Sequence, residues 1–209
     1  MQGEALASAS FRIMTATDVP AVLDIEKMSF RLPWNTERFT ELLSGPNGAT
    51  CVVLEISGRI VSYFVVELRG ESTHILNLAV HPEHLRRGHA LRCLAFIHKL
   101  ARRAFDIASG RDPSTVGSRE ARDGRPLASS RVAERESVES HAGRSSRRKA
   151  AQIVDEHAGM IHLEVGESNL AAQLLYRKAG YRATRILRNH YPSLDEDAYE
   201  MVRKIHPGA

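Results

Sequence analysis

The chain has 209 residues, of which 43% are hydrophobic and 26% are charged. This composition is typical of a globular protein long enough for one α/β domain with a buried core. Its apolar runs fall well short of the roughly 20 residues that a membrane-spanning helix requires, and its first ten residues lack the basic start and apolar stretch of a secretory signal. We therefore expect a cytoplasmic protein that makes no membrane contact.

The formal net charge of +4 is carried by one segment. Ser109–Lys149 contains ten Lys and Arg against six Asp and Glu, whereas the rest of the chain holds equal numbers of both. The segment has no aromatic residue, and its one leucine is Leu127. Because it offers little apolar surface to bury, we expect a disordered insertion rich in Arg and Ser. It is either a tolerated, solvated loop or a weak, salt-sensitive contact for RNA or a ribosomal surface.

The residues before the insertion predict a strand, two helices, three strands and a long helix, in that order. Asp18 and Asn35 each precede a segment with helically spaced apolar residues, so both are candidate helix caps. The expected elements are a strand at Phe11–Met14, helices at Val19–Met28 and from Asn35 to about Gly45, strands at Thr50–Ile56, Ile60–Leu68 and His74–Val80, and a helix at Arg86–Phe105.

The residues after the insertion predict a second run of elements. They are a short helix at Ala150–Glu156, a strand at Met160–Val165, a helix at Asn169–Ala179 ended by Gly180, and strands at Tyr181–Leu187 and Ala198–Ile205. This order implies an α/β (α+β) fold with a mixed central sheet of about seven strands flanked by helices. Residues 11–108 and 150–206 form its two halves, and 109–149 separates them.

The cysteines and histidines do not point to a metal. Cys51 and Cys93 each lie in an apolar pattern without a second thiol nearby, so we expect both to be packing residues. The histidines are scattered, and no pair has zinc-ligand spacing of the HExxH type. We therefore expect no metal cofactor.

The strongest local feature is the loop between an apolar strand and a long helix. The strand ends at Val80, and Gly88 opens the helix, whose free backbone N–H groups form an anion site. Arg86 and Arg87 add positive charge beside it, and the small Ala90 leaves room. The segment predicts a diphosphate site, although a solvated basic helix start has the same pattern.

This loop is similar to the Q/R-x-x-G-x-G/A signature of the GNAT N-acetyltransferases, read as LRRGHA over Leu85–Ala90, with Leu85 in place of Gln or Arg. In that family the strand before the loop pairs with the pantetheine arm of acetyl-CoA. The resemblance implies acetyl-CoA as the cosubstrate. The implied cofactor-binding residues are Leu78, Ala79, Val80, Arg86, Arg87, Gly88, His89, Ala90 and Leu91.

Three later motifs resemble the RimI-type members, which acetylate the N-termini of ribosomal proteins. Leu163–Tyr181 resembles LEV-x-x-S-N-x-x-A-x-x-L-Y-x-x-x-G-F/Y, and Glu196–Met201 resembles E-D-A-x-x-M. Arg188–Pro192 resembles R-x-N-Y-Y-P, with His190 in place of the first tyrosine. The resemblance extends over nearly all of the chain apart from its first ten residues and the insertion.

Acetyl transfer to an amine requires a base for the amine and an acid for the leaving thiolate. Glu164 interrupts an apolar strand, where it is either an outward-facing carboxylate or a base. Tyr176 is either a packed helix aromatic or an acid, and Asn169, two helical turns before it, is a helix cap, a cofactor partner or both. The resemblance implies that Glu164 is the general base, acting directly or through water, and that Tyr176 is the general acid.

The same resemblance implies a peptide slot lined by Leu32, Pro33 and Tyr191, with Trp34 packing beside it. Backbone N–H groups of the third strand would polarise the acetyl carbonyl. The function implied is acetylation of protein N-terminal α-amino groups, with ribosomal protein S18 as a possible acceptor, by a monomer or weak dimer. The alternatives are acetylation of a small amine or lysine, and a non-catalytic adaptor that binds acetyl-CoA or RNA.

Overall fold

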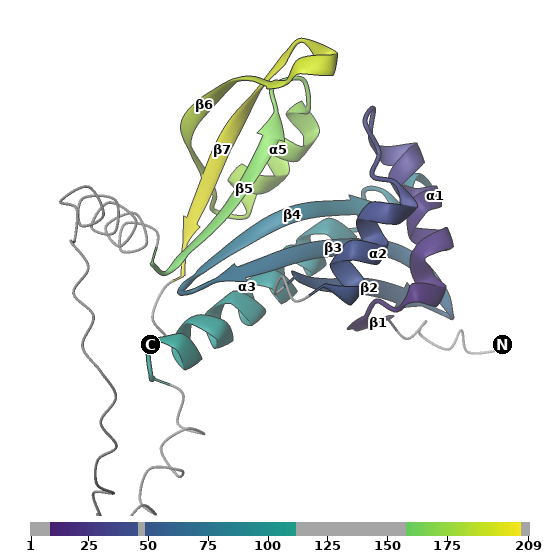
Figure 1. Cartoon of the computed structure of the whole chain (residues 1–209), viewed down its shortest axis with the longest axis horizontal. Coiled ribbons are helices and arrows are strands. Elements are labelled where there is room, and N and C mark those ends of the chain that lie inside the picture. Colours follow the sequence, from purple (N-terminus) through teal and green to yellow (C-terminus); the bar gives the residue numbers. More distant parts are fainter. Residues whose placement is uncertain (1–8, 46–48, 112–157, 206–209) are drawn as a thin grey trace, which may run out of the picture.

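A seven-stranded mixed sheet runs through the residues that the computed structural model describes, namely 9–45, 49–111 and 158–205. The strand order is β1-β2-β3-β4-β5-β7-β6, and every neighbouring pair is antiparallel except β4 and β5 (Figure 1). The mixed sheet and the predicted order of strands and helices are confirmed. The expected helix at Ala150–Glu156 and residues 112–149 of the insertion lie outside the described residues.

The bounds of the elements follow the predicted pattern closely. The strands are β1 (Ala9–Ile13), β2 (Ala49–Ile56), β3 (Arg59–Arg69), β4 (Ser72–Val80), β5 (Met160–Gly166), β6 (Arg182–Tyr191) and β7 (Glu196–Lys204). The helices are α1 (Val19–Ser29), α2 (Thr36–Ser44), α3 (His89–Ala108) and α5 (Leu170–Lys178). Within the described ranges, no helix is long and apolar enough to span a membrane.

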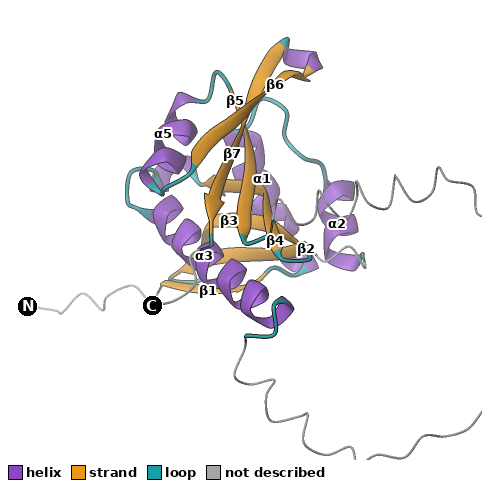
Figure 2. Cartoon of the chain, turned by 90° about the vertical axis from the view of Figure 1, so that its left-hand side faces the viewer, coloured by secondary structure: helices purple, strands orange, loops and turns teal. Residues whose placement is uncertain are grey.

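The sheet has an apolar core on each face. Figure 2 shows α3 in front of the strands and α1 behind them. Alternate residues of β3 divide between the two cores, since Phe64 and Val66 pack with α3 whereas Tyr63 and Val65 pack with α1 and α2. This division follows from the two-residue period of a strand, which sends successive side chains to opposite faces. The core under α3 extends to β5, α5 and β7 and therefore joins the two halves of the chain.

The helix starts confirm one expected cap and change another. Asn35 caps α2, since its side chain accepts a hydrogen bond from the Arg38 N–H at 3.0 Å. Asp18 occupies the N-cap position of α1 without capping it, because its carboxylate binds the Arg12 guanidinium at 2.7 and 2.9 Å instead. Helix α3 begins at His89 and not at Arg86, because two residues of the loop before it have positive φ.

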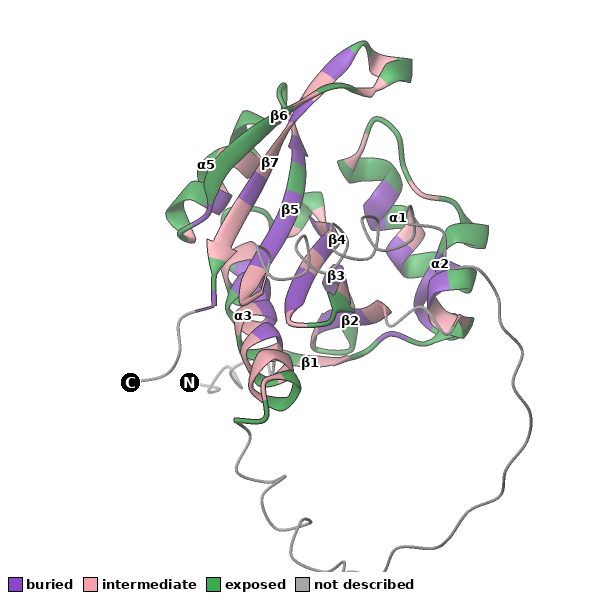
Figure 3. Ribbon diagram, turned by 60° about the vertical axis from the view of Figure 1, so that its left-hand side comes forward, coloured by how far each residue is buried: buried purple, intermediate pink, exposed green. Residues whose placement is uncertain are grey.

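Strand β6 is longer than the pattern predicts, because it contains bulges that interrupt the alternation. The register passes from Leu187↔Ala198 to Tyr191↔Glu196, so three residues of β6 lie opposite the single Asp197 of β7. Figure 3 shows that β6 is largely exposed, whereas β5 and β7 are mostly buried or half-buried. Strand β6 therefore has no regular alternation of apolar and polar residues from which its end could be predicted.

The described residues on either side of 112–157, near Arg111 and Gly159, lie beside each other. The Arg111 guanidinium lies 5.3 Å from the centre of the Phe105 ring, and a Cβ on Gly159 would lie 3.3 Å from the same ring. A Gly/Ser linker of about ten residues reaches on the order of 17 Å, which is ample for this gap. We predict that replacing 112–157 by such a linker leaves the circular dichroism spectrum and the melting temperature within a few degrees of the original; loss of the cooperative transition would contradict this.

Candidate active site

The site begins where β4 and β5 separate. Their parallel pairing is confined to Thr73↔Ile161, His74↔His162 and Ile75↔Leu163. At the same point β4 has one extra residue, Leu76, relative to β3, which forms a bulge. Beyond it β4 runs towards α3 and β5 towards α5, and Figure 1 shows the two strands diverging. The edge of β4 from residue 76 to residue 80 is therefore open for hydrogen bonds with a ligand.

A cavity of about 430 Å³ fills the opening between the two strands. It brings together predicted site residues from five parts of the chain, namely Leu32, Leu78, Glu164, Asn169, Tyr176 and Tyr191. A second cavity, of about 550 Å³, shares Glu164 and Tyr191 with the first and extends past His74 and Arg69. Glu164 and Tyr191 therefore line both cavities.

Several predicted residues lie outside the first cavity. Pro33 and the loop Arg86–Leu91 do not line it, and neither do Ala79 and Val80. The side chains of Ala79 and Val80 are 4% and 8% exposed, and the Ala79 carbonyl accepts a hydrogen bond from the Ser62 hydroxyl at 2.6 Å. These two residues offer a ligand little beyond their backbone at the open edge of β4.

The start of α3 has the geometry of an anion site. Gly88 is its N-cap with φ +81, and the first helical hydrogen bond runs from the Arg92 N–H to the Gly88 carbonyl. The N–H groups of residues 89 to 91 precede that bond, so they point out of the helix end. Arg86 and Arg87 are exposed beside them. Two cations and a 20-residue helix dipole at one point fit a diphosphate.

His89 contributes to this loop through its backbone. Its side chain is 7% exposed, and burial lowers the pKa of the imidazole, so the ring is neutral at physiological pH. The ring therefore adds no charge for a phosphate. The loop's positive charge comes from the two arginines instead.

We predict that Gly88→Ala weakens acetyl-CoA binding about tenfold. A Cβ there meets nothing within 4 Å, but positive φ costs an alanine about 1–2 kcal/mol, and the backbone shift that relieves it moves the N–H groups. Titration calorimetry measures the change. Gly58→Ala is the matched control, since Gly58 has φ +78 and equal space in a remote turn; an equal loss of affinity in both variants would contradict the prediction.

Glu164 projects from β5 away from the core. Its neighbours Leu163 and Val165 are 3% and 4% exposed, whereas the Glu164 side chain is 51% exposed, as strand alternation requires. One carboxylate oxygen lies 3.0 Å from His190 Nε2. The Glu164 carboxylate therefore lines both cavities and is paired with His190.

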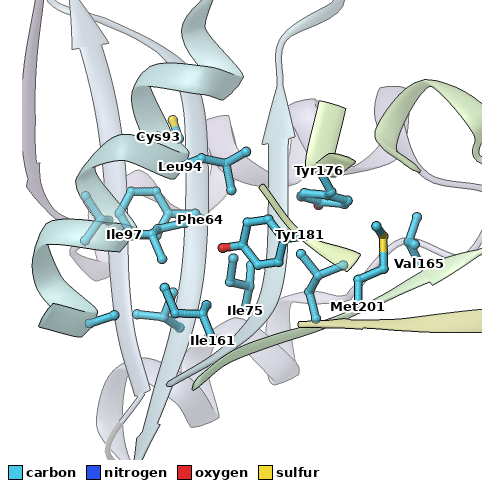
Figure 4. Packing of buried hydrophobic residues seen from close by; sticks show 14 of the residues in the cluster. Phe64, Ile75, Cys93, Leu94, Ile97, Ile161, Val165, Tyr176, Tyr181 and Met201 are labelled. Carbon is cyan, nitrogen blue, oxygen red and sulfur yellow. The ribbon is translucent and has the colours of Figure 1, made fainter. Parts of the chain in front are cut away.

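Tyr176 lies on the inner face of α5 and is 8% exposed. Figure 4 shows it beside Tyr181, in the core cluster that also contains Val165 and Met201. The two phenol rings meet edge to face with centres 5.8 Å apart. Burial raises the pKa of Tyr176 to about 12, so its hydroxyl keeps its proton through the neutral range.

The start of α5 is held in place by a carboxylate of β7. Glu196 accepts hydrogen bonds from the Ser168 N–H at 2.9 Å and the Ser168 hydroxyl at 2.7 Å, which lowers the pKa of Glu196. Asn169 caps the helix, since its side chain accepts from the Ala172 N–H at 3.1 Å. A Cβ on Gly166 would lie too close to the Glu196 carboxylate, so a larger residue there would displace this carboxylate. These contacts fix where α5 presents Tyr176.

Glu26 is a site residue that the sequence interpretation missed. It lines the first cavity from α1, is 1% exposed, and accepts hydrogen bonds from the Trp34 N–H at 2.8 Å, the Asn77 amide at 3.2 Å and the Tyr63 hydroxyl. Burial raises its pKa. A signal was present, because Glu26 follows Val22 by four residues and therefore lies on the buried face of α1.

Comparison with known proteins places this fold. Residues 19–110, from α1 to the end of α3, match the sequence profile of the Acetyltransferase (GNAT) family. This match covers 92 of the 209 residues, and it confirms the predicted resemblance to the GNAT N-acetyltransferases.

Three relatives illustrate the similarity. A Bacillus subtilis protein described as a ribosomal protein bS18-alanine N-acetyltransferase is 27% identical over 194 residues, which are 92% of this chain and 93% of that protein. The crystal structure of the ribosomal-protein-S18-alanine N-acetyltransferase from Escherichia coli is 20% identical, with a TM-score of 0.64 over 97% of each chain. The yncA acetyltransferase of Salmonella typhimurium, solved with acetyl-CoA, is 13% identical, with a TM-score of 0.57 over 96% of each chain.

Among residues 9–45, 49–111 and 158–205, no group of three or more His, Cys, Asp or Glu side chains is arranged to hold a metal ion. Cys51 and Cys93 are both buried, and burial raises the pKa of each thiol to about 11. Both cysteines are therefore poor nucleophiles and pack as small apolar residues.

Proposed function

We propose that this enzyme transfers the acetyl group of acetyl-CoA to the α-amino group of a protein N-terminus, with ribosomal protein S18 as the acceptor. The observation that carries the proposal is the meeting of Glu164 and Tyr176 in one cavity at the open edge of β4. The names of the Bacillus subtilis and Escherichia coli relatives support the choice of acceptor.

Residues at the two ends of the open β4 edge fit acetyl-CoA. The N–H groups at the start of α3, with Arg86 and Arg87, would hold the diphosphate. Leu78, Ala79 and Val80 would pair through their backbone with the pantetheine arm, as strands pair with extended chains, and Asn169 lines the same cavity as Leu78. Bound there, acetyl-CoA supplies a thioester carbonyl that a free amine can attack.

Glu164 and Tyr176 would divide the proton transfers. A protein α-amino group has a pKa of about 7.7–8.0, so removal of one proton near neutrality makes it a nucleophile. Glu164 is an exposed carboxylate at the junction of the cavities and would take that proton. Tyr176 keeps its proton because its pKa is about 12, so it can protonate the departing sulfur.

The second cavity, which shares Glu164 and Tyr191 with the first, would admit the acceptor. Leu32 is 47% exposed on the loop between α1 and α2, and Tyr191 lies on the other wall of the first cavity. Pro33 shapes the same loop beside Trp34, whose ring packs on Phe39 with centres 5.5 Å apart. A chain end with a small first side chain would fit between these walls.

We predict that Tyr176→Phe lowers kcat about 10²-fold and leaves the acetyl-CoA dissociation constant within twofold, because it removes a proton donor and preserves the packing. Stopped assays of free thiol release measure kcat. Tyr199→Phe on β7 is the matched control and should retain full activity. An unchanged kcat in Tyr176→Phe would overturn the role of Tyr176 as the acid.

The acceptor class is tested by competition. With equal concentrations of an S18 N-terminal peptide, an internal-lysine peptide, a polyamine and an aminoglycoside, the α-amine of the S18 peptide should be acetylated more than the other amines.

We also propose that the protein is a cytoplasmic monomer or weak dimer and that its basic segment 109–149 contacts RNA weakly. Retention on an RNA column at low salt should disappear when 112–149 is removed; equal retention would leave the segment without that role.

A further inference from the structure

A histidine that departs from the family motif lies against the proposed base. His190 Nε2 is 3.0 Å from a Glu164 carboxylate oxygen, although His190 belongs to β6 and Glu164 to β5, with β7 between them. The RimI-type motif has tyrosine at position 190. This chain therefore places an imidazole where the motif has a phenol.

The backbone that projects His190 is firmly held. His190 is the last of the three β6 residues opposite Asp197, and Asn189 before it has φ +48, a conformation that asparagine tolerates. The Asp197 carboxylate accepts from the Asn189 N–H at 2.7 Å and from the Arg188 guanidinium at 2.6 Å. The bulge is thus a defined structure that directs one imidazole across β7.

The charges around His190 leave Glu164 as its direct partner. Its ring is edge-on to Tyr191 with centres 4.8 Å apart, and burial together with Glu164 and Glu196 raises the pKa of Tyr191, which stays neutral. From β7, Asp197 is paired with Arg188 at 2.6 Å, and Glu196 is bound to Ser168. The two hydrogen bonds from Ser168, and to a smaller extent Arg31 on the loop after α1, lower the pKa of Glu196. Glu200 of β7 is paired with Arg185 at 3.3 Å.

The reaction itself requires a route for one proton. The amine begins as an ammonium ion and ends as an amide nitrogen with one hydrogen, so the nitrogen loses two protons while the sulfur gains one. One proton per turnover must therefore reach solvent. In the proposed mechanism Glu164 receives a proton from the nitrogen, and it must release that proton before the next turnover. The His190 side chain is 30% exposed and therefore contacts both Glu164 and solvent.

We propose that His190 is a proton-relay residue that accepts the proton from Glu164 and passes it to solvent. This inference rests on the proposed role of Glu164 as the base. In the step, the O–H bond of the protonated Glu164 breaks and an N–H bond forms at His190 Nε2. The imidazolium then loses a proton to water, and the carboxylate is restored for the next turnover. His190 touches Glu164 and no reacting atom, so it acts only through the carboxylate.

The first test is the pH dependence of His190→Gln relative to the original enzyme. Glutamine keeps a hydrogen bond to Glu164 and accepts no proton. Only a neutral imidazole can accept a proton. The kcat of the original enzyme divided by that of His190→Gln should therefore be about ten at alkaline pH and fall as the pH is lowered. The ratio cancels the titration of the substrate amine. A ratio that is constant with pH would overturn the relay and leave only an orienting contact.

The second test is rescue and coupling. His190→Gly should recover activity with millimolar imidazole, whereas the same additive should leave His190→Gln unchanged. His190→Gln added to Glu164→Gln should cost nothing further, because the relay acts through the carboxylate. Absence of rescue, or a full additional loss in the double variant, would contradict the proposal. Melting temperatures and acetyl-CoA affinity check that each variant is folded.

A third readout does not use activity. The ring ¹⁵N resonances of His190 should shift when Glu164 becomes Gln, and His190→Tyr, which restores the motif residue, should behave as His190→Gln in the pH test. If the enzyme acetylates another amine instead of N-terminal peptides, the proposed acceptor is wrong, and the relay is tested with that amine. If N-terminal peptides are acetylated and the ratio is flat, the relay alone is wrong.

Discussion

Glu164→Gln is expected to lower kcat by about 10²–10³-fold, which lies within the range that general acid–base catalysis typically contributes. The amide keeps the size of the side chain and removes its capacity to accept a proton. Because Glu164 projects from β5 into the junction of the two cavities and is not part of the α3 loop, the acetyl-CoA dissociation constant should stay within twofold. Steady-state rates with saturating substrates, and calorimetry for the cofactor, measure the two quantities.

Glu167→Gln is the matched control for this experiment. Glu167 lies three residues further on, is exposed and does not line the first cavity, so its amide variant should keep full activity. Raising the pH distinguishes loss of the general base from any other cause of a low kcat in Glu164→Gln. If Glu164 removes the ammonium proton, the deficit should shrink as the amine becomes neutral above about pH 8. A deficit that is the same from pH 7 to pH 9.5 would contradict the role of base.

Glu26→Ala is expected to lower the free energy of unfolding by about 3–5 kcal/mol, because it leaves three buried donors without an acceptor at about 1–3 kcal/mol each. The donors are the Tyr63 hydroxyl, the Trp34 N–H and the Asn77 amide. They belong to β3, the loop after α1, and β4, so one carboxylate ties together the cavity wall and the bulge region. Urea unfolding followed by circular dichroism measures the loss.

Glu26→Gln separates the charge from the hydrogen bonds. Its volume is unchanged, and the Tyr63 hydroxyl can rotate to accept from the new amide, so the loss should be about 1 kcal/mol. A loss in Glu26→Ala as small as that of a surface substitution, about 0.5 kcal/mol, would mean that the three donors find other partners and that the carboxylate does not hold the wall.

The difference in the free energy of unfolding between Glu26→Gln and the original protein should depend on pH in a predictable direction. Burial raises the pKa of Glu26 in the folded state. The stability that this carboxyl contributes is therefore complete below the unfolded pKa of about 4.3, and it is lost as pH rises through the raised folded value. The free energy of unfolding of Glu26→Gln minus that of the original protein should rise as pH increases from 4 towards neutrality. A difference that falls with pH would contradict the raised pKa.

The order of elements was predictable because it rests on local patterns. Apolar residues recur with helical period in α1 and form short continuous runs in β2 and β3, and Asn35 and Gly180 mark helix ends by their own chemistry. The diphosphate loop was visible for the same reason, since glycine, arginines and a helix start are neighbours in sequence.

What the sequence did not reveal depends on partners far along the chain. Asp18 is bound by Arg12 of β1 and therefore does not cap α1. The carboxylate of Glu26 finds Asn77, 51 residues away, and His190 reaches Glu164 only because Asp197 holds a bulge. The separation of β4 and β5, which creates the cavity, depends on where their pairing stops. No local period encodes these contacts.

The central claim is tested most directly by mass spectrometry of an S18 N-terminal peptide that begins with alanine and contains an internal lysine, after incubation with the enzyme and acetyl-CoA. The proposal predicts one added acetyl group on the α-amino nitrogen, at a rate that Glu164→Gln abolishes almost completely. Acetylation of the lysine alone, or no transfer to the peptide while a small amine is acetylated, would contradict it.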